Sequence, residues 1–275
     1  MRRRAFLSAI FATCAANPEN RTILDLPAPP ADARLPYGPD PLQFGELRLP
    51  KTRDPAPVAF VIHGGFWRAA YDLRHIGHLC AALARAGVAT WSLEYRRIGD
   101  KGGGWPGTFE DVARGADRLR ALAGKYPLDL TRVVAIGHSA GGHLALWLGA
   151  QRKVRLRGIV SLAGVADLRK AWELRLGNGV VKDLLGGTPD EVPERYRQAS
   201  PIELLPLGVP QRLVHGAADS IVPFAISRDY QRAAAADGDD AQLVPLKGTG
   251  HFEAIDPRSK AWPVVRQTVL RLLRK

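Results

Sequence analysis

Short apolar runs alternate with amphipathic segments along most of the chain, and this alternation limits the folds open to it more than any other feature. The apolar runs have the length of buried strands, and the amphipathic segments have the spacing of helices. The predicted strands are residues 44–49, 58–63, 88–95, 132–137, 158–164, 211–216 and 241–246. The predicted helices are residues 72–86, 108–123, 140–150, 224–236 and 257–273, and Thr108 with Asp111 resembles a capping box. This order predicts an α/β fold, with a mostly parallel central sheet and helices on both faces.

The chain begins with a segment typical of an export signal. Residues 1–16 place three arginines before a short apolar run. The sequence RRAFL at residues 3–7 is similar to a twin-arginine signal. We therefore expect export to the periplasm or the medium, with a cytoplasmic protein as the alternative. Whether Cys14 is lipidated or removed with the leader stays open.

The rest of the chain divides into an arm and one domain. Residues 17–43 contain seven prolines and little periodicity, which indicates a Pro-rich arm or linker. Residues 44–275 are predicted to form one domain, because α/β folds of this length are commonly single units. Residues 165–210 hold short helical pieces broken by Gly and Pro, and we expect a short cap-like insertion there.

Charge and cysteine content exclude several classes of partner. The net charge is +12 and the pI is about 10.1, but the arginines are scattered and form no basic helix or RNA-binding signature. We therefore expect no nucleic-acid partner. Two cysteines support neither a disulfide framework nor a zinc site, so no metal or other cofactor is expected. No apolar run is long enough for a stable membrane span, and a homodimer stays open.

The sequence GHSAG, residues 137–141, supplies a candidate nucleophile in Ser139. It lies between a predicted buried strand and a predicted apolar helix, which is the context that a nucleophile elbow requires. The sharp turn crowds the positions two before and two after the serine, so both must be glycine or nearly as small. The N-terminus of the helix lies beneath the hydroxyl and favours developing negative charge.

A serine needs a base, and the base needs an orienting carboxylate. His251 lies late in the chain, in a predicted loop between a strand and the last helix. Asp219 follows the strand at residues 211–216, and it is better placed than Glu253, Asp256 or Asp229. The order Ser, Asp, His agrees with the elbow motif. We therefore predict Ser139, Asp219 and His251 as a catalytic triad.

Acyl transfer also needs N–H donors for the oxyanion. Ala140 follows the nucleophile directly, and the HGGFW loop at residues 63–67 follows an early strand. Its glycines let the backbone turn N–H groups toward a pocket, so Gly65 and Phe66 are the other candidates. Trp67 and Trp105 are candidates for the substrate pocket, with ordinary loop packing as the alternative.

With these residues assigned, residues 44–273 resemble an α/β-hydrolase. The segments HGGFW, EYRRIG, GHSAGGHLAL and GTGHF are similar to the branch that contains arylformamidases of the HGGxW type (kynurenine formamidases) and small carboxylesterases of the acetyl xylan or feruloyl esterase kind. The resemblance implies that Ser139, Asp219 and His251 form the triad, with the Gly65–Phe66 region and Ala140 as the oxyanion hole.

The expected function is hydrolysis of small carboxylic esters through an acyl-enzyme. The apparent export signal disfavours a cytoplasmic catabolic role, and the short insertion at residues 165–210 leaves little room for a large lid. The alternatives are an arylformamidase that cleaves aryl formamides and a catalytically inactive hydrolase-fold binding protein. The acyl and leaving groups stay open, as does the preference for ester over amide.

Overall fold

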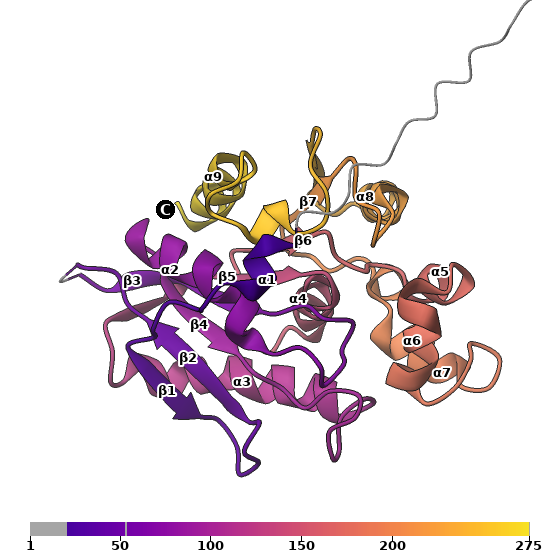
Figure 1. Ribbon diagram of the computed structural model, residues 1–275, viewed down its shortest axis with the longest axis horizontal. Helices are drawn as coiled ribbons and strands as arrows, with labels where there is room; N and C mark the ends of the chain where they lie inside the picture. Colours follow the sequence, from indigo (N-terminus) through magenta and orange to yellow (C-terminus); the bar gives the residue numbers. More distant parts are fainter. Residues whose placement is uncertain (1–20, 53, 275) are drawn as a thin grey trace, which may run out of the picture.

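An eight-stranded sheet in the order β1-β2-β4-β3-β5-β6-β7-β8 forms the centre of the molecule (Figure 1). The computed structural model describes residues 21–52 and 54–274, so the predicted leader with Cys14 lies outside the described residues. The strands are β1 (Ala33–Pro36), β2 (Phe44–Arg48), β3 (Ala56–Ile62), β4 (Ala89–Leu93), β5 (Leu128–His138), β6 (Gly158–Leu162), β7 (Gln211–Gly216) and β8 (Ala241–Leu246). Strands β3 to β8 pair in parallel and β1 and β2 pair antiparallel, which confirms the predicted mostly parallel sheet.

Helices cover both faces of the sheet because the strand residues are apolar on both. In β3, Phe60 and Ile62 belong to one buried cluster, while Ala59 and Val61 belong to the other. The first cluster packs against α3 (Gly107–Ala123), α4 (Ala140–Gln151) and α8 (Phe224–Ala236). The second packs against η1 (Leu73–Ile76), α2 (Gly77–Arg85) and α9 (Trp262–Leu273). Figure 1 shows α2 and α3 on opposite sides of the strands.

The cap-like insertion is helical and small. It contains α5 (Leu168–Glu173), α6 (Leu176–Leu185), α7 (Pro193–Ala199) and η2 (Pro201–Leu204), which lie together beyond one end of the sheet (Figure 1). Arg68 donates a hydrogen bond to the carbonyl of Gly177 at 2.8 Å, and Trp105 N–H donates to the carbonyl of Leu184 at 2.8 Å. These contacts attach the insertion to the loops that follow β3 and β4.

The Pro-rich arm is more closely integrated than the sequence predicts. β1 lies in the arm, yet it pairs with β2 as an edge strand of the sheet. The short helix α1 (Thr22–Asp25) places Ile23, which is 1% exposed, in the cluster under α2 and α9. The arm thus supplies both a strand and a core side chain to the fold.

Two helix starts differ from the prediction. Thr108 is not an N-cap: it lies inside α3, and its hydroxyl accepts from Gly104 N–H and donates to the carbonyl of Arg96. Asp111 forms no capping box, because its carboxylate pairs with Arg96 and accepts from Gln43. The last helix begins at Trp262 rather than at residue 257. In the part of the chain that the structure describes, no helix combines the length and apolarity of a membrane span.

Candidate active site

Ser139 lies in a strained turn between β5 and α4. Its φ and ψ are 56° and −119°, a conformation that a non-glycine residue rarely adopts. A Cβ at Gly137 would lie 2.0 Å from the carbonyl oxygen of Gly141, and a Cβ at Gly141 would lie 2.1 Å from that of Ile62. Both glycines are therefore required sterically, which is the reason the elbow motif has them. The turn places the serine at the N-terminus of an apolar helix in which residues 140–149 are all buried.

Asp219 and His251 are joined by a short hydrogen bond. Nδ1 of His251 lies 2.7 Å from Oδ2 of Asp219, and both side chains are almost completely buried. Oδ1 of Asp219 accepts from the N–H groups of Ile221 and Val222 at 2.9 and 2.8 Å. Because Nδ1 donates to the carboxylate, Nε2 is the basic nitrogen of a neutral His251. Ser139 and His251 line the same pocket, so all three predicted residues meet at one end of the sheet.

A second histidine shares the carboxylate of Asp219. Nε2 of His215 lies 3.1 Å from Oδ2 of Asp219 and 2.9 Å from the carbonyl oxygen of Val222. Both partners are acceptors, so Nε2 carries a proton, while Nδ1 lies 2.7 Å from Oγ of Ser227. Burial alone would raise the pKa of Asp219, but hydrogen bonds from His215 and His251 hold that pKa well below its ordinary value. The sequence indicates only that His215 ends a strand, so it does not reveal the contact between His215 and Asp219.

His138 holds the loop that carries His251. Nε2 of His138 donates to the carbonyl oxygen of His251 at 3.0 Å, and the two rings lie 4.5 Å apart. Burial and the nearby His251 lower the pKa of His138, so its ring stays neutral. The variable position of the GxSxG motif therefore anchors the base, a role that the motif itself does not indicate.

The predicted oxyanion donors lie on the loop after β3 and at the start of α4. Gly65 has φ 110° and Phe66 has φ 52°, and both line the pocket that contains Ser139. Within the described residues, neither N–H group donates a hydrogen bond to the rest of the backbone or to a side chain. Ala140 is the first residue of α4 and is fully buried. Unpaired N–H groups beside a serine are the arrangement that an oxyanion requires.

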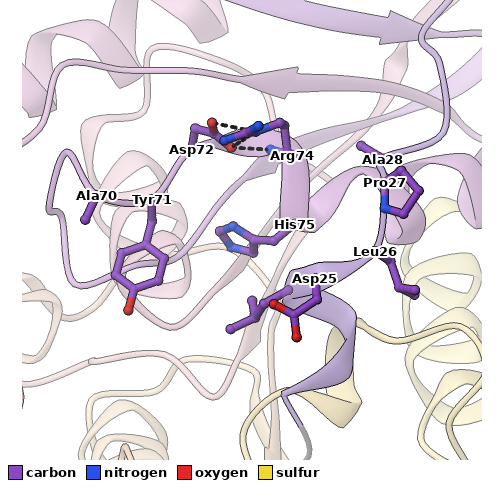
Figure 2. A pocket seen from close by; sticks show the side chains of 10 residues that line it. Asp25, Leu26, Pro27, Ala28, Ala70, Tyr71, Asp72, Arg74 and His75 are labelled. Atoms are coloured by element: carbon purple, nitrogen blue, oxygen red, sulfur yellow. Dashed lines mark hydrogen bonds and ion pairs between the residues drawn. The ribbon is translucent and has the colours of Figure 1, made fainter.

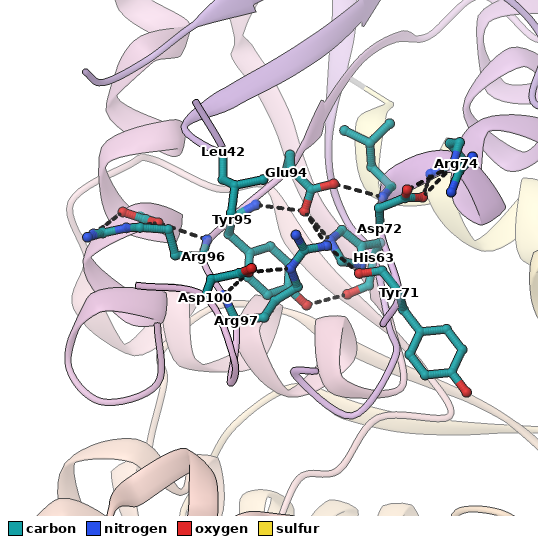
Figure 3. A network of polar contacts seen from close by, with 12 residues as sticks. Leu42, His63, Tyr71, Asp72, Arg74, Glu94, Tyr95, Arg96, Arg97 and Asp100 are labelled. Atoms are coloured by element: carbon teal, nitrogen blue, oxygen red, sulfur yellow. Dashed lines mark hydrogen bonds and ion pairs between the residues drawn. The ribbon is translucent and has the colours of Figure 1, made fainter. Parts of the chain in front are cut away.

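A buried ionic network supports this loop (Figure 3). Oε1 of Glu94 lies 3.1 Å from Nε2 of His63 and 3.0 Å from Nη1 of Arg97. Oε2 accepts from the N–H of Leu73 at 3.1 Å, and the hydroxyl of Tyr95 donates to the carbonyl of His63 at 3.0 Å. Burial alone would raise the pKa of Glu94, but His63 and Arg97 hold that pKa below its ordinary value.

The network also reaches the turn after the oxyanion loop. Arg97 donates to the carbonyl of Tyr71, and the side chain of Tyr71 packs against Gly65, where a Cβ would lie 2.4 Å from that of Tyr71. Gly65 thus needs to be glycine for this contact and for its positive φ. Glu94 therefore positions His63, the residue before the glycine pair, by direct contact, and it positions the turn at Tyr71 through Arg97.

Neither tryptophan that was proposed for the substrate pocket lines it. Trp67 is fully buried, and its indole N–H donates to Nδ1 of His143 at 3.2 Å. Burial lowers the pKa of His143 to about 4, so its ring is neutral and can accept this bond. Trp105 is half-buried and packs edge-on against Phe109 of α3, at the border of the core. Both indoles thus pack against other side chains, and neither is among the residues that line the pocket at Ser139.

The pocket at Ser139 is small and aromatic. Its volume is about 50 Å³. It is lined by Arg21, Leu24, Gly65, Phe66, Tyr71, His75, His138, Ser139, Ile221, His251 and Phe252. Two of these residues belong to the arm, so the N-terminal segment forms part of the wall. Among residues 21–52 and 54–274, no three His, Cys, Asp or Glu side chains are grouped as a metal site.

Comparison with known proteins adds a family and a set of similar folds. The BD-FAE family model matches residues 46–233. Esterase LipC of Mycobacterium tuberculosis is 28% identical over 244 residues, which are 81% of this chain and 60% of LipC. The chain thus spans less than two thirds of the length of that relative.

The solved structures agree with the fold. A truncated carbohydrate esterase from gut microbiota is 20% identical and superposes with a TM-score of 0.77, covering 90% of this chain and 98% of the other. An acetyl ester-xyloside bifunctional hydrolase from Caldicellulosiruptor lactoaceticus is 22% identical with a TM-score of 0.71, covering 88% and 95%.

Proposed function

The chain belongs to the BD-FAE family, within the carboxylesterase branch of the α/β-hydrolases, and from this membership we propose that it hydrolyses small carboxylic esters. The observation that carries the proposal is the 2.7 Å bond between His251 and Asp219 beside the strained Ser139. The esterase names of LipC and of the similar solved structures support it.

The proposed reaction runs through an acyl-enzyme. Oγ of Ser139 attacks the ester carbonyl carbon while Nε2 of His251 takes the hydroxyl proton. Asp219 holds the imidazole in the required tautomer and stabilises its positive charge. The N–H groups of Ala140 and of Gly65 or Phe66 donate to the oxyanion. When the tetrahedral intermediate collapses, the C–O bond breaks and His251 gives its proton to the leaving alcohol.

Water completes the cycle. A water molecule attacks the acyl carbon and passes one proton to His251, and the acid leaves when that proton returns to Ser139. About 10–15 Å³ of such volume holds one water, so the space of about 50 Å³ at Ser139 has room for only a few groups of that size. This space therefore favours a short acyl group. No step needs a metal or an organic cofactor.

The direct test is hydrolysis of p-nitrophenyl acetate by the wild type and by Ser139→Ala. We expect Ser139→Ala to lower kcat by about 10⁴-fold or more, because the nucleophile is lost. The matched control is Ser161→Ala, which removes another buried serine hydroxyl, one that has no partner within the described residues. Wild-type activity in Ser139→Ala, or equal losses in both variants, would contradict the proposal.

Two further measurements separate the alternatives. A fluorophosphonate should add its mass to Ser139 in the wild type, whereas no addition would favour an inactive binding protein. Phenyl acetate should be cleaved faster than formanilide, and the reverse order would favour an arylformamidase.

A further inference from the structure

The oxyanion loop holds three consecutive residues at positive φ. The φ angles of Gly65, Phe66 and Trp67 are 110°, 52° and 54°. A residue with a side chain rarely adopts such an angle, and both Phe66 and Trp67 carry large side chains. A backbone conformation of this kind persists only where the surrounding structure fixes it. The contacts of each residue therefore show which part of the fold holds the loop.

The first residue of this run, Gly65, is held by the segment that follows the loop in the chain. Gly65 packs against Tyr71, in the turn at residues 70–75. Figure 2 shows Tyr71 and His75 of this turn beside a cavity of about 440 Å³, whose other wall is residues 24–28 of the arm. The support of Gly65 is thus local to this turn.

The last residue of the run is held by the core, whereas the middle one is not. The indole N–H of Trp67 donates to His143, and the carbonyl oxygen of Trp67 accepts from the N–H of Ile98 at 2.7 Å. Phe66 is half-buried, and within residues 21–52 and 54–274 neither its N–H nor its carbonyl oxygen has a hydrogen-bond partner. The position of its backbone therefore depends on its two neighbours and on the contacts of its ring.

The ring of Phe66 packs on a second strained turn, in the cap-like insertion. The first turn of α6 is left-handed, with φ angles of 55°, 61° and 77° at Gly177, Asn178 and Gly179. Consecutive left-handed residues are unusual in a chain of L-amino acids. The N–H of Gly179 donates to the carbonyl of Arg175 at 3.2 Å and closes the turn. A Cβ at Gly177 would lie 2.9 Å from Cδ1 of Phe66, so only glycine lets the ring approach this closely.

Arg68 forms a second link between the same two turns. Its N–H donates to the carbonyl of Gly65 at 3.0 Å, which closes the oxyanion loop. Its guanidinium donates to the carbonyl of Gly177 at 2.8 Å. Gly177 therefore contacts the loop at two points, through the ring of Phe66 and through the side chain of Arg68.

We propose that Gly177 is a positioning residue for the oxyanion hole, which fixes the strained backbone of Phe66 from the cap-like insertion. This inference rests on the proposed ester hydrolysis and gives the insertion a role in it. Gly177 does not line the pocket at Ser139, so it acts through Phe66 and Arg68 rather than on the substrate. Oxyanion donors must lie about 2.7–3.1 Å from the developing charge, so a small displacement of the Phe66 N–H lowers the rate.

The test compares alanine at two glycines of one turn. In the full chain, Gly177→Ala should displace the ring of Phe66 and lower kcat for p-nitrophenyl acetate about 10- to 100-fold, with KM changed less than about threefold. Gly179→Ala is the matched control, because its φ of 77° imposes a similar strain while its Cβ would meet no other part of the described chain within 4 Å.

Both variants place a side chain at positive φ, so both should lower the urea midpoint by similar amounts. Gly179→Ala should lower kcat about threefold or less, because it leaves Phe66 in place. Equal losses of kcat in the two variants would overturn the assignment.

Removal of the ring should abolish the effect of the added methyl group. Phe66→Ala keeps the backbone N–H but has no ring for a Cβ at Gly177 to displace. Adding Gly177→Ala to Phe66→Ala should therefore change kcat less than about twofold. Losses of kcat that multiply would show that the two residues act independently, and would overturn the inference.

The link through Arg68 has its own test. Arg68→Met should lower kcat about 3- to 10-fold, the effect of one lost hydrogen bond, and Arg68→Lys, which can still donate, should restore part of the rate. Arg175→Met is the control, since Arg175 is exposed and its side chain has no hydrogen-bond partner in the described part of the chain. Equal kcat in the two methionine variants would overturn the role of Arg68.

Modification by a fluorophosphonate separates this inference from the proposed function. Oγ of Ser139 displaces fluoride from phosphorus while His251 takes the proton, and the phosphonyl oxygen occupies the place of the oxyanion. The rate of modification should fall about 10- to 100-fold in Gly177→Ala and stay within about threefold of wild type in Gly179→Ala. Equal rates in the two variants would overturn the inference. The expected pattern in a protein that cleaves no ester would contradict ester hydrolysis while supporting the role of Gly177.

Discussion

The two sides of Ser139 are supported by polar networks of different kinds. On the β3–β4 side, Glu94 and Arg97 fix backbone positions of the oxyanion loop through ionic contacts that have no reason to change during a turnover. On the β7–β8 side, one carboxylate serves two imidazoles, and one of them, His251, gains and loses a proton in every proposed cycle. The first network fixes the positions of backbone groups in the oxyanion loop, and the second controls how strongly His251 binds its proton.

From this difference we predict which residues control the pH dependence of the rate. A change on the Glu94 side should displace N–H groups and weaken the fold, with the shape of the pH–rate profile unchanged. A change on the Asp219 side should alter the balance between neutral and charged His251, and so move the profile. Variants of Asp219, Glu94 and His215 test this division.

Asp219→Asn should have the largest effect. An amide in place of the carboxylate can turn its NH₂ toward Nδ1 of His251 and favour the wrong tautomer, which in other triads costs about 10⁴-fold in kcat. The measurement is kcat for p-nitrophenyl acetate at the pH optimum. Asp237→Asn, at an exposed position after α8, is the control. A loss of less than tenfold would show that Asp219 is not the orienting carboxylate.

The triad residues and the oxyanion loop could be proposed from the sequence, whereas the residues that support them, His215 on one side and Glu94 and Arg97 on the other, could not. The elbow, the late histidine and the acid after β7 follow from local motifs and from the order of strands. Glu94 and Arg97, in contrast, look like ordinary polar residues at the end of a strand. Their burial depends on His63, about thirty positions earlier, so no local pattern indicates it.

Partners that lie far away in the sequence also explain the other differences between the predicted and the observed structure. The prolines of residues 17–43 indicate an arm or linker. β1 nevertheless forms there because it pairs with β2, and only the folded sheet supplies that partner. Thr108 has the chemistry of an N-cap, but the turn before α3 carries its hydroxyl to the carbonyl of Arg96 instead. Trp67 is a pocket candidate because it belongs to the HGGFW motif. Its indole N–H instead donates to His143, a residue that follows the elbow in the sequence. The long, periodic elements were predicted correctly because their signals are local.

Glu94→Gln should have an intermediate effect on rate and a large one on stability. The substitution removes the carboxylate that Arg97 and His63 share and leaves Asp100 as the remaining charged partner of Arg97, so the free energy of unfolding should fall by about 1–3 kcal/mol. Displaced oxyanion donors should lower kcat about 10- to 100-fold. Urea unfolding and kcat measure the two effects, with exposed Glu110→Gln as the control. A shifted pH–rate profile at unchanged stability would break the proposed division.

Acid titration gives the sign of the Glu94 contribution. Because the pKa of Glu94 is lowered on folding, its ionised form stabilises the protein fully above its unfolded pKa of about 4.3. That contribution is lost as the pH falls through the lower folded value. The stability difference between wild type and Glu94→Gln should therefore be constant near neutral pH and should narrow below about pH 4. A difference that widened in acid would mean that Glu94 is buried in its neutral form.

His215→Leu should have the smallest effect on rate and the clearest effect on the pH profile. Without the Nε2 proton of His215, more negative charge remains on Oδ2 of Asp219, and the cationic form of His251 is favoured. The acidic limb of kcat/KM should move to higher pH by about 0.5 unit, and kcat at the optimum should fall about 3- to 10-fold. His215→Gln, whose amide can still donate, should restore much of the wild-type limb. A purely structural role for His215 would give the same stability loss in both variants with an unmoved limb, and the two sides of Ser139 would then differ only in which residues hold the backbone.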